Sequence, residues 1–274
     1  MTATAHGGPA DWRYVAVEMS GQVATVRFDR KDGVNALSLR AIEELTAAAE
    51  WVRNHPDIYA VALVGGARGF SAGRDLRDPE LNGLDDRPLL HRRHIAGAGG
   101  RMCKAWASLE PFTACGIEGF AIGGGLALAV STDWRAVGRS AHFRAPEAAL
   151  GLSMSWGAVP RLVNLIGPAR TKQLLIHGND RVDAESAHAW GLAQAVVDDG
   201  GAMAAAVEAA TKAAATPPVA ARMIKKAVDA YASALADAVI HMDADQVLLA
   251  ETGKDHVEAV EAFFEKRDPN FTGA

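Results

Sequence analysis

Three short segments of the chain contain residue types that can do chemistry, and the first is a run of glycines. Gly123–Gly125 stand directly after an apolar strand pattern at 112–117 and before a helical pattern at 126–130. Glycines at the start of a helix let the backbone approach a ligand closely and leave N–H groups unpaired, while the helix dipole adds positive partial charge. The segment therefore suits an anion or an oxygen that becomes negative during a reaction, although a tight strand-to-helix turn has the same composition.

The second segment, Phe70–Leu76, follows another apolar strand pattern and a Gly65-Gly66 turn. Its small residues at 71–73 predict a second sharp bend of the backbone, after which Asp75 can cap a helix. A capped turn without chemistry has the same composition, so both interpretations stay open for this segment taken alone.

The third candidate is Glu147, which follows Pro146 and precedes an apolar stretch at 148–152. A carboxylate among apolar neighbours is desolvated, and desolvation raises its pKa toward the value of an effective general base. The alternative is an acidic residue in the first turn of a helix, where the helix dipole favours a negative charge.

The elements that must position these segments alternate between strands and helices. Residues 14–19 and 23–28 predict a β-hairpin. The apolar runs at 58–64, 112–117 and 134–137 are typical of strands buried on both faces. A turn and a helical pattern follow each of these three runs, which indicates an α/β fold.

The character of the sequence changes near residue 202. Alanine-rich helical patterns cover 202–215 and 219–235. We therefore divide the chain into a core at 1–201, which contains the candidate site, and a helical C-terminal region at 202–274.

The composition excludes several classes of protein. The chain has 274 residues, a net charge of −5 and 49% hydrophobic residues, so it is globular and lacks the basic face that nucleic acids require. The longest uncharged apolar run, at 120–130, has 11 residues and is too short to span a membrane. Residues 1–10 show no leader pattern, and Cys103 and Cys115 lack metal-ligand spacing. We predict a cytoplasmic protein with no metal and with no nucleic-acid or membrane partner.

Taken in order and with their spacing, the three segments resemble the crotonase superfamily, the enoyl-CoA hydratases and isomerases. The resemblance covers nearly the whole chain, because further parts of the sequence match the family's pattern in register. These parts are Phe28-Asp29-Arg30 with Asn35-Ala36-Leu37, Gly119–Asp133, Pro146–Leu162, Glu185 with Ala187 and Gly191-Leu192, and Phe263–Gly273. Each motif is weak alone, whereas the ordered set is highly specific.

The resemblance implies both a fold and a substrate. The fold is a crotonase-like spiral of β-β-α units with a helical C-terminal trimerisation region, assembled as a homotrimer or as a hexamer of two trimers. The substrate is an acyl-CoA thioester, so no separate cofactor is expected. Its carbonyl lies between two backbone N–H groups, which residue-by-residue placement assigns to Arg74 and Gly124. Two fixed donors stabilise the enolate that forms when a proton leaves the carbon beside the thioester.

Ala127 departs from the pattern of the family's hydratases, and this departure decides which reaction we expect. Those hydratases use two glutamates to hold and activate a water. Glu147 corresponds to the second, whereas Ala127 occupies the position of the first, three residues after Gly124. A single carboxylate still moves a proton between two carbons of one enolate, and family isomerases keep only the second glutamate. We therefore predict isomerisation of 3-enoyl-CoA to 2-enoyl-CoA, with Glu147 as the catalytic residue.

Two other functions stay open. One is enoyl-CoA hydration or acyl-CoA thioester hydrolysis with a substitute polar group, for which His142, Ser153 and Ser155 are candidates near Glu147. The other is a catalytically degenerate protein that binds CoA esters or serves in an assembly, which Ala127 would allow.

The resemblance also implies where the coenzyme binds. Family members hold its adenine and phosphates with the loop after the first hairpin and with basic residues near the C-terminus. The candidate residues are Arg30, Lys31, Ala36, Leu37 and Ala72, together with Phe263 and Lys266 from a neighbouring subunit.

Overall fold

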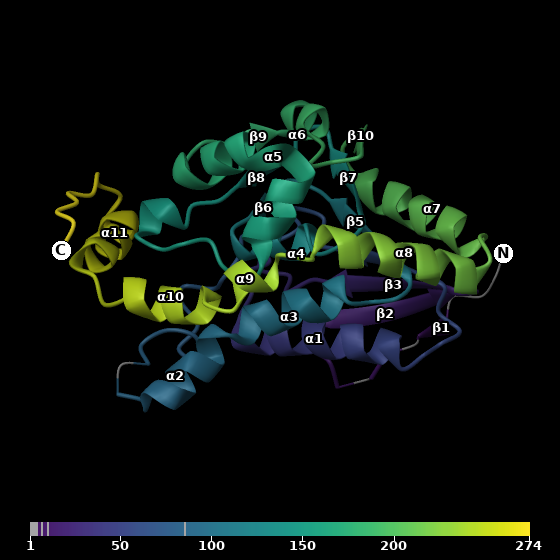
Figure 1. The fold of residues 1–274 in the computed structure, drawn as a ribbon, viewed down its shortest axis with the longest axis horizontal. Coiled ribbons are helices and arrows are strands. Elements are labelled where there is room, and N and C mark those ends of the chain that lie inside the picture. The colour runs from purple at the N-terminus through teal and green to yellow at the C-terminus, as the bar shows by residue number, and fades with distance from the viewer. Residues whose placement is uncertain (1–4, 7, 10, 85) are drawn as a thin grey trace.

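Two β-sheets organise the computed structural model, which describes residues 5–6, 8–9, 11–84 and 86–274 (Figure 1). The larger sheet has seven strands in the order β1 (Ala5–His6), β2 (Val15–Ser20), β3 (Val23–Phe28), β4 (Ala60–Val64), β5 (Phe112–Ile117), β7 (Trp134–Gly138) and β10 (Ala195–Val197). Its first three strands pair antiparallel, and every later pair is parallel. The smaller sheet contains β6 (Phe120–Ile122), β8 (His142–Arg144) and β9 (Val182–Asp183).

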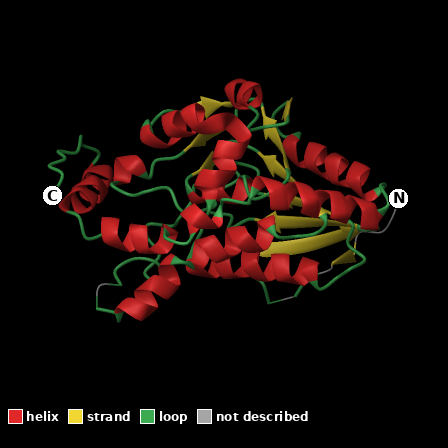
Figure 2. Cartoon of the chain, viewed as in Figure 1, coloured by secondary structure: helices red, strands yellow, loops and turns green. Residues whose placement is uncertain are grey.

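Helices surround both sheets (Figure 2). They are α1 (Leu39–Arg53), α2 (Leu89–Ala96), α3 (Ala98–Ala107), α4 (Gly124–Ala129), α5 (Ala158–Ile176), α6 (Ala184–Trp190), α7 (Ala202–Ala214), α8 (Pro218–Ala232), α9 (Asp237–Ile240), α10 (Asp243–Ala250) and α11 (Lys254–Glu265). A short 3₁₀ turn covers Ala148–Leu150. The arrangement confirms the predicted α/β class with a helical C-terminal region.

The predicted strands are present, and their burial explains why the apolar pattern of the sequence predicts them. The β2–β3 hairpin pairs Val17 with Val26, as its alternating pattern predicts. All five residues of β4 are buried because the sheet is covered on both faces. On one face Val61 and Leu63 belong to the main hydrophobic core, and on the other the small side chains at 60 and 62 face a helix.

That helix is α7, the first of the alanine-rich C-terminal segments. Ala206 and Ala210 are fully buried in one cluster with Ala60, Ala62 and Ala114 of the sheet. Alanine at these positions lets the helix backbone lie close to the strands. The division at 201/202 remains a prediction, and the helix that opens the second part covers one face of the main sheet (Figure 1).

One expectation about connectivity is wrong. The glycine run does not follow β5 directly, because β6 lies between them and belongs to the smaller sheet. The chain turns between the two sheets at Gly119, whose φ is +59° and where a Cβ atom would lie 2.2 Å from the Arg68 carbonyl oxygen. A strand of three residues is too short to produce a readable period in the sequence.

The segment after α8 places α10 near α2 and α11 beside the 3₁₀ turn that follows Glu147 (Figure 1). Within the described residues, none of the helices is long and apolar enough to cross a membrane. Most of residues 1–10, for which no leader was expected, lie outside the described residues.

Candidate active site

The two glycine-containing segments lie side by side. The Ser71 N–H donates to the Phe120 carbonyl at 3.2 Å, and the Ile122 N–H donates to the Ser71 carbonyl at 2.9 Å. The Ser71 hydroxyl donates to the Asn35 carbonyl at 2.8 Å, and the Asn35 carboxamide donates to the Phe70 carbonyl at 2.8 Å. These bonds join the loop after the first hairpin to both segments, so the spacing of the two bends is set by backbone pairing.

Two backbone N–H groups meet where the segments touch. Gly73 has a φ of +84°, and a Cβ atom there would lie 2.9 Å from the Gly124 nitrogen. Leu37 donates to the Gly73 carbonyl and accepts from Asp75, which leaves the Arg74 N–H between them. Neither the Arg74 N–H nor the Gly124 N–H has a hydrogen-bond partner within the described residues. Gly124 is the first residue of α4, where an N–H lacks an intrahelical partner.

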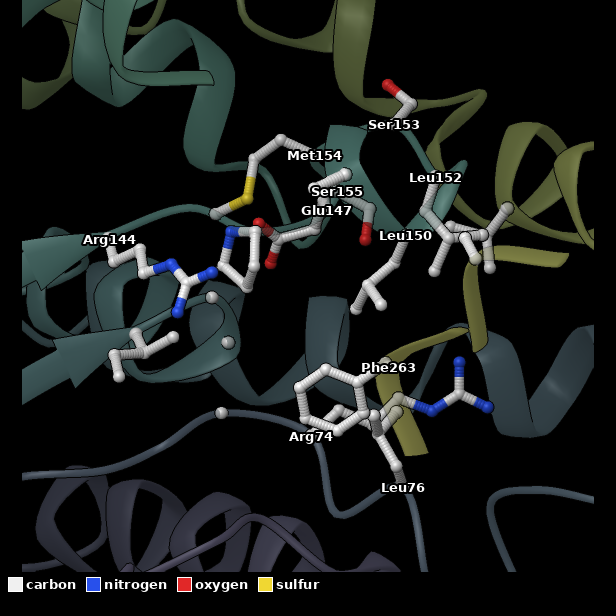
Figure 3. A pocket seen from close by; sticks show the side chains of 18 of the residues that line it. Arg74, Leu76, Arg144, Glu147, Leu150, Leu152, Ser153, Met154, Ser155 and Phe263 are labelled. Carbon is white, nitrogen blue, oxygen red and sulfur yellow. The ribbon is translucent and has the colours of Figure 1, made fainter. Parts of the chain in front are cut away.

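Asp75 caps none of the described helices, contrary to the capping interpretation. Its carboxylate accepts from the Arg30 guanidinium at 2.7 Å and from the Arg77 N–H at 3.0 Å. The Arg74 guanidinium turns away from the unpaired N–H groups, donating to the Leu81 carbonyl and to Glu251 (Figure 3). At position 74, therefore, only the backbone faces the place where the two segments meet.

The Glu147 carboxylate lies over the glycine turn. Its Oε1 atom is 2.7 Å from the position that a Cβ atom of Gly123 would occupy, and Gly123 has a φ of +52°. The Leu150 and Leu152 N–H groups donate to the Glu147 carbonyl at 3.0 and 2.8 Å, which curls the chain around this residue. Only a glycine at 123 leaves room for the carboxylate, so the turn and the acid are one unit.

Burial raises the pKa of Glu147 to about 7, and the nearby positive charge of Arg144 opposes this shift. The Glu147 Oε2 atom is buried without a hydrogen-bond partner in the described part of the chain. Arg144 donates to the Gly178 carbonyl at 3.2 Å and to the Asn179 carboxamide oxygen. A carboxyl whose pKa is near 7 both accepts and returns a proton at neutral pH.

These groups line one cavity of about 480 Å³ (Figure 3). Most of its lining is apolar, and it includes Ala127, which is fully buried. Among the described residues that line it, the only carboxylates are Glu147 and Asp268. Because Asp268 belongs to the exposed C-terminal segment, Glu147 is the one acid at the glycine turn.

The candidate coenzyme residues divide into three groups. Ala72 and Phe263 line the cavity. Ala36 and Leu37 are not part of the lining, although Leu37 is hydrogen-bonded to the backbone of Gly73 and Asp75 on either side of Arg74. The three cations are outside the lining: Lys31 and Lys266 are exposed, and Arg30 is held by Asp32 and Asp75.

The polar residues considered as substitutes for a second glutamate differ in whether they line the cavity. Ser153 and Ser155 line the cavity, whereas His142 does not. Ser153 is exposed, and its hydroxyl points away from Glu147 (Figure 3).

Sequence reasoning missed several residues of the cavity, and the two that bear most on its chemistry and shape are Arg144 and Trp156. Arg144 is the last residue of β8, which has only three residues. Trp156 lies in an irregular stretch between the 3₁₀ turn and α5. Neither position carries a periodic signal. The position of Arg144 three residues before Glu147 was the one available clue.

Comparisons with known proteins agree with this geometry. A family model described as "Enoyl-CoA hydratase/isomerase" matches residues 18–274. The "Short-chain-enoyl-CoA hydratase" of Clostridium acetobutylicum is 29% identical over 92% of this chain and 95% of its own length. The "1,2-epoxyphenylacetyl-CoA isomerase" of Escherichia coli is 30% identical over 92% of this chain and 95% of its own length.

Solved structures give the same result. An enoyl-CoA hydratase/isomerase from Pseudoalteromonas atlantica superposes with a TM-score of 0.84 at 25% sequence identity, covering 95% of this chain and 100% of its own. The chain therefore belongs to the enoyl-CoA hydratase/isomerase family of the crotonase superfamily, as an enzyme that acts on acyl-CoA.

Proposed function

We propose that this enzyme isomerises 3-enoyl-CoA to 2-enoyl-CoA with a single carboxylate. The observation that carries the proposal is that the cavity has a carboxylate at position 147 and an alanine at position 127. Glu147 lies at the glycine turn next to two unpaired backbone N–H groups, and Ala127, on the next turn of α4, offers no second acid. Hydration needs a held water, whereas isomerisation needs only one group that carries a proton.

In the proposed reaction, the Arg74 and Gly124 N–H groups donate to the thioester carbonyl oxygen. Glu147 removes a proton from C2, and the electron pair of that C–H bond delocalises into the carbonyl and the C3–C4 double bond as a dienolate. The two donors stabilise the negative oxygen, which is worth about 10²–10³ in rate for each donor. Glu147 then returns the proton to C4, which leaves the double bond between C2 and C3. No other reactant is consumed.

The relatives support isomerisation and also keep a second candidate open. The relative from Escherichia coli is named as an isomerase, and the relative from Clostridium acetobutylicum as a hydratase. A hydratase would need another polar group to hold the water. Ser155 is the one candidate that supports this reading, because it is half-buried and lines the cavity. Thioester hydrolysis would need the same held water.

The absorbance of the conjugated enoyl thioester separates these functions. Purified enzyme is supplied with 3-enoyl-CoA and, separately, with 2-enoyl-CoA, and release of free CoA thiol is followed in parallel. We expect absorbance to rise with the first substrate and thiol to stay constant. A loss of absorbance with 2-enoyl-CoA and no gain with 3-enoyl-CoA would identify a hydratase. Thiol release would identify a hydrolase, and binding without turnover of either ester would identify a degenerate CoA-ester-binding protein.

We also propose that the enzyme assembles as a homotrimer or as two stacked trimers, uses no cofactor besides its substrate and works in the cytoplasm. Large apolar side chains exposed along α8 support the assembly, since such a surface is typical of a subunit contact. They are Val219, Met223, Ile224, Val228 and Tyr231. Light scattering on the purified enzyme gives the mass of the assembly and tests this part directly.

A further inference from the structure

The indole of Trp156 is held between two glycines on different helices. A Cβ atom on Gly99, in α3, would lie 1.9 Å from the Trp156 Cε2 atom. A Cβ atom on Gly124, at the start of α4, would lie 2.3 Å from the Trp156 Cζ3 atom. The ring therefore contacts the Cα atoms of both residues, and Gly124 is also the residue whose N–H faces the cavity. Neither glycine could be replaced by a larger residue without displacing the ring.

The backbone that carries this ring is in an unfavourable conformation. Trp156 has a φ of +59°, in the left-handed region that bulky side chains rarely adopt, and Gly157 follows with a φ of +69°. Contacts from two other places hold the turn. The Gly157 N–H donates to the Asp243 carboxylate at 2.7 Å, and the Arg161 guanidinium donates to the Gly157 carbonyl at 2.7 Å and to the Trp156 carbonyl at 3.3 Å.

Packing alone does not account for this arrangement, because the ring is half-buried and lines the cavity. The residues that α2 and α3 contribute to the lining of the cavity are small or aliphatic: Ile95, Ala96 and Gly99. An acyl group whose carbonyl is bonded to the Gly124 N–H has its next carbons within reach of the indole. The ring lies against Gly99 of α3 and Gly124 at the start of α4, so it fills the space between these two helices next to the Gly124 N–H.

We propose that Trp156 is the specificity-determining wall of the acyl pocket and restricts this enzyme to short acyl groups. The inference rests on the proposed function for the position of the thioester carbonyl. A wall of this kind rejects an oversized acyl group because the rigid ring, held by two helices and a constrained turn, cannot move aside. One additional methylene against a closed pocket changes discrimination by roughly 10–200-fold.

The test measures binding of two saturated esters, butanoyl-CoA and decanoyl-CoA, by calorimetry. Saturated esters have no double bond to isomerise or hydrate, and release of CoA thiol is monitored to exclude hydrolysis. For the native enzyme we expect decanoyl-CoA to bind no more tightly than butanoyl-CoA. For Trp156→Ala we expect the ratio of the two dissociation constants to shift toward decanoyl-CoA by at least about tenfold. Trp156→Phe, which keeps most of the packing, is expected to shift the ratio in the same direction by less.

Trp190→Ala is the matched control, because it removes the same side chain from a position outside the cavity, next to Arg170. It should leave the ratio unchanged. A purely structural Trp156 would lower the melting temperature in its variants without moving the ratio, and that result would overturn the proposal. An equal loss of affinity for both esters, or a native preference for decanoyl-CoA, would overturn it as well.

The outcome is separable from that of the isomerase assay. A shifted ratio of dissociation constants without isomerase activity would support Trp156 as the wall of the acyl pocket and would reject the proposed isomerisation. Isomerase activity with an unshifted ratio would do the reverse.

Discussion

Two parts of the cavity lining differ in burial and charge. They are the glycine turn with Glu147, which we call the inner end, and the C-terminal segment with Arg267, which we call the mouth. At the inner end, Glu147 lies over Gly123, and the unpaired Arg74 and Gly124 N–H groups belong to the backbone. At the mouth, Arg267 lies on the exposed C-terminal segment and is paired with the carboxylates of Glu258 and Glu265. The inner end therefore depends on buried groups with fixed positions, and the mouth on exposed charges that already have partners.

The difference determines how each end responds to change. Water cannot take the place of a buried donor or carboxylate. Removing one such group therefore lowers turnover by the whole of its contribution. An exposed charge is screened by water and salt, and its removal costs little. We therefore expect large effects on turnover from the inner end and small effects on affinity from the mouth. Four experiments test this contrast.

Glu147→Gln should have the largest effect. It removes the proton carrier but keeps the shape of the side chain, so we expect turnover of 3-enoyl-CoA to fall by about 10²–10⁴ while the dissociation constant for a CoA ester changes little. Glu208→Gln, on the exposed surface of α7, is the control and should keep full activity. Undiminished turnover in the Glu147 variant would remove this residue from the mechanism.

Gly73→Ala should reduce turnover by about 10²–10³, comparable to the loss of one donor to the enolate oxygen. The added methyl group would lie 2.6 Å from the Ile122 carbonyl oxygen and 2.9 Å from the Gly124 nitrogen, so the two N–H groups must separate. Gly21→Ala is the matched control, since Gly21 also has a positive φ and nothing lies within 4 Å of the new atom. If both variants lose activity equally, strain rather than geometry at the site is responsible.

The pH dependence of kcat/KM should reflect the raised pKa of Glu147. The ionised carboxylate is the base, so activity should be low in acid and rise through a midpoint near 7. Arg144→Gln removes the positive charge that lowers this pKa, so the midpoint should move upward and the loss of activity should be larger at pH 6 than at pH 9. Arg144→Lys keeps the charge and should keep the midpoint. An unchanged midpoint in Arg144→Gln would show that Arg144 does not influence the proton carrier.

The smallest effects are expected at exposed charges, which include two lysines outside the cavity lining. Lys31→Ala and Lys266→Ala should each weaken binding of a CoA ester by about 1.5- to 5-fold, because exposed ion pairs contribute roughly 0.2–1 kcal/mol. Turnover at saturation should stay the same. Lys212→Ala, on the exposed side of α7, is the control. Calorimetry at low and high salt measures the effect, and a loss of affinity of more than a hundredfold would contradict the contrast between buried and exposed groups.

Sequence reasoning predicted the elements whose side chains follow a period. The β2–β3 hairpin and the buried β4 and β5 were legible because one or both of their faces are covered. The same reasoning identified the segments around Gly73, Gly124 and Glu147, which the structure brings together. It missed β6 because a three-residue strand is set by pairing with its neighbour rather than by its own composition.

Arg30 illustrates the other limit of the sequence. Its charge and its place after the hairpin made it a candidate for the coenzyme phosphates. In the fold its guanidinium is bonded to Asp32 and Asp75, which are 2 and 45 residues away in the chain. Asp32 is near in the chain, but the contact with Asp75 forms only when two distant segments pack together, and no local pattern predicts it.

The sequence by itself determined which segments can bend sharply, present free N–H groups and supply a carboxylate, because these properties depend on glycine, proline and acid types at short spacing. It also places at position 127 an alanine, which cannot carry a proton. Only the tertiary structure decided that Glu147 lies over Gly123 at a raised pKa and that the indole of Trp156 lies between Gly99 and Gly124. Those properties depend on burial and on approaches of a few ångströms between segments distant in the chain, which arise only when the whole chain is packed.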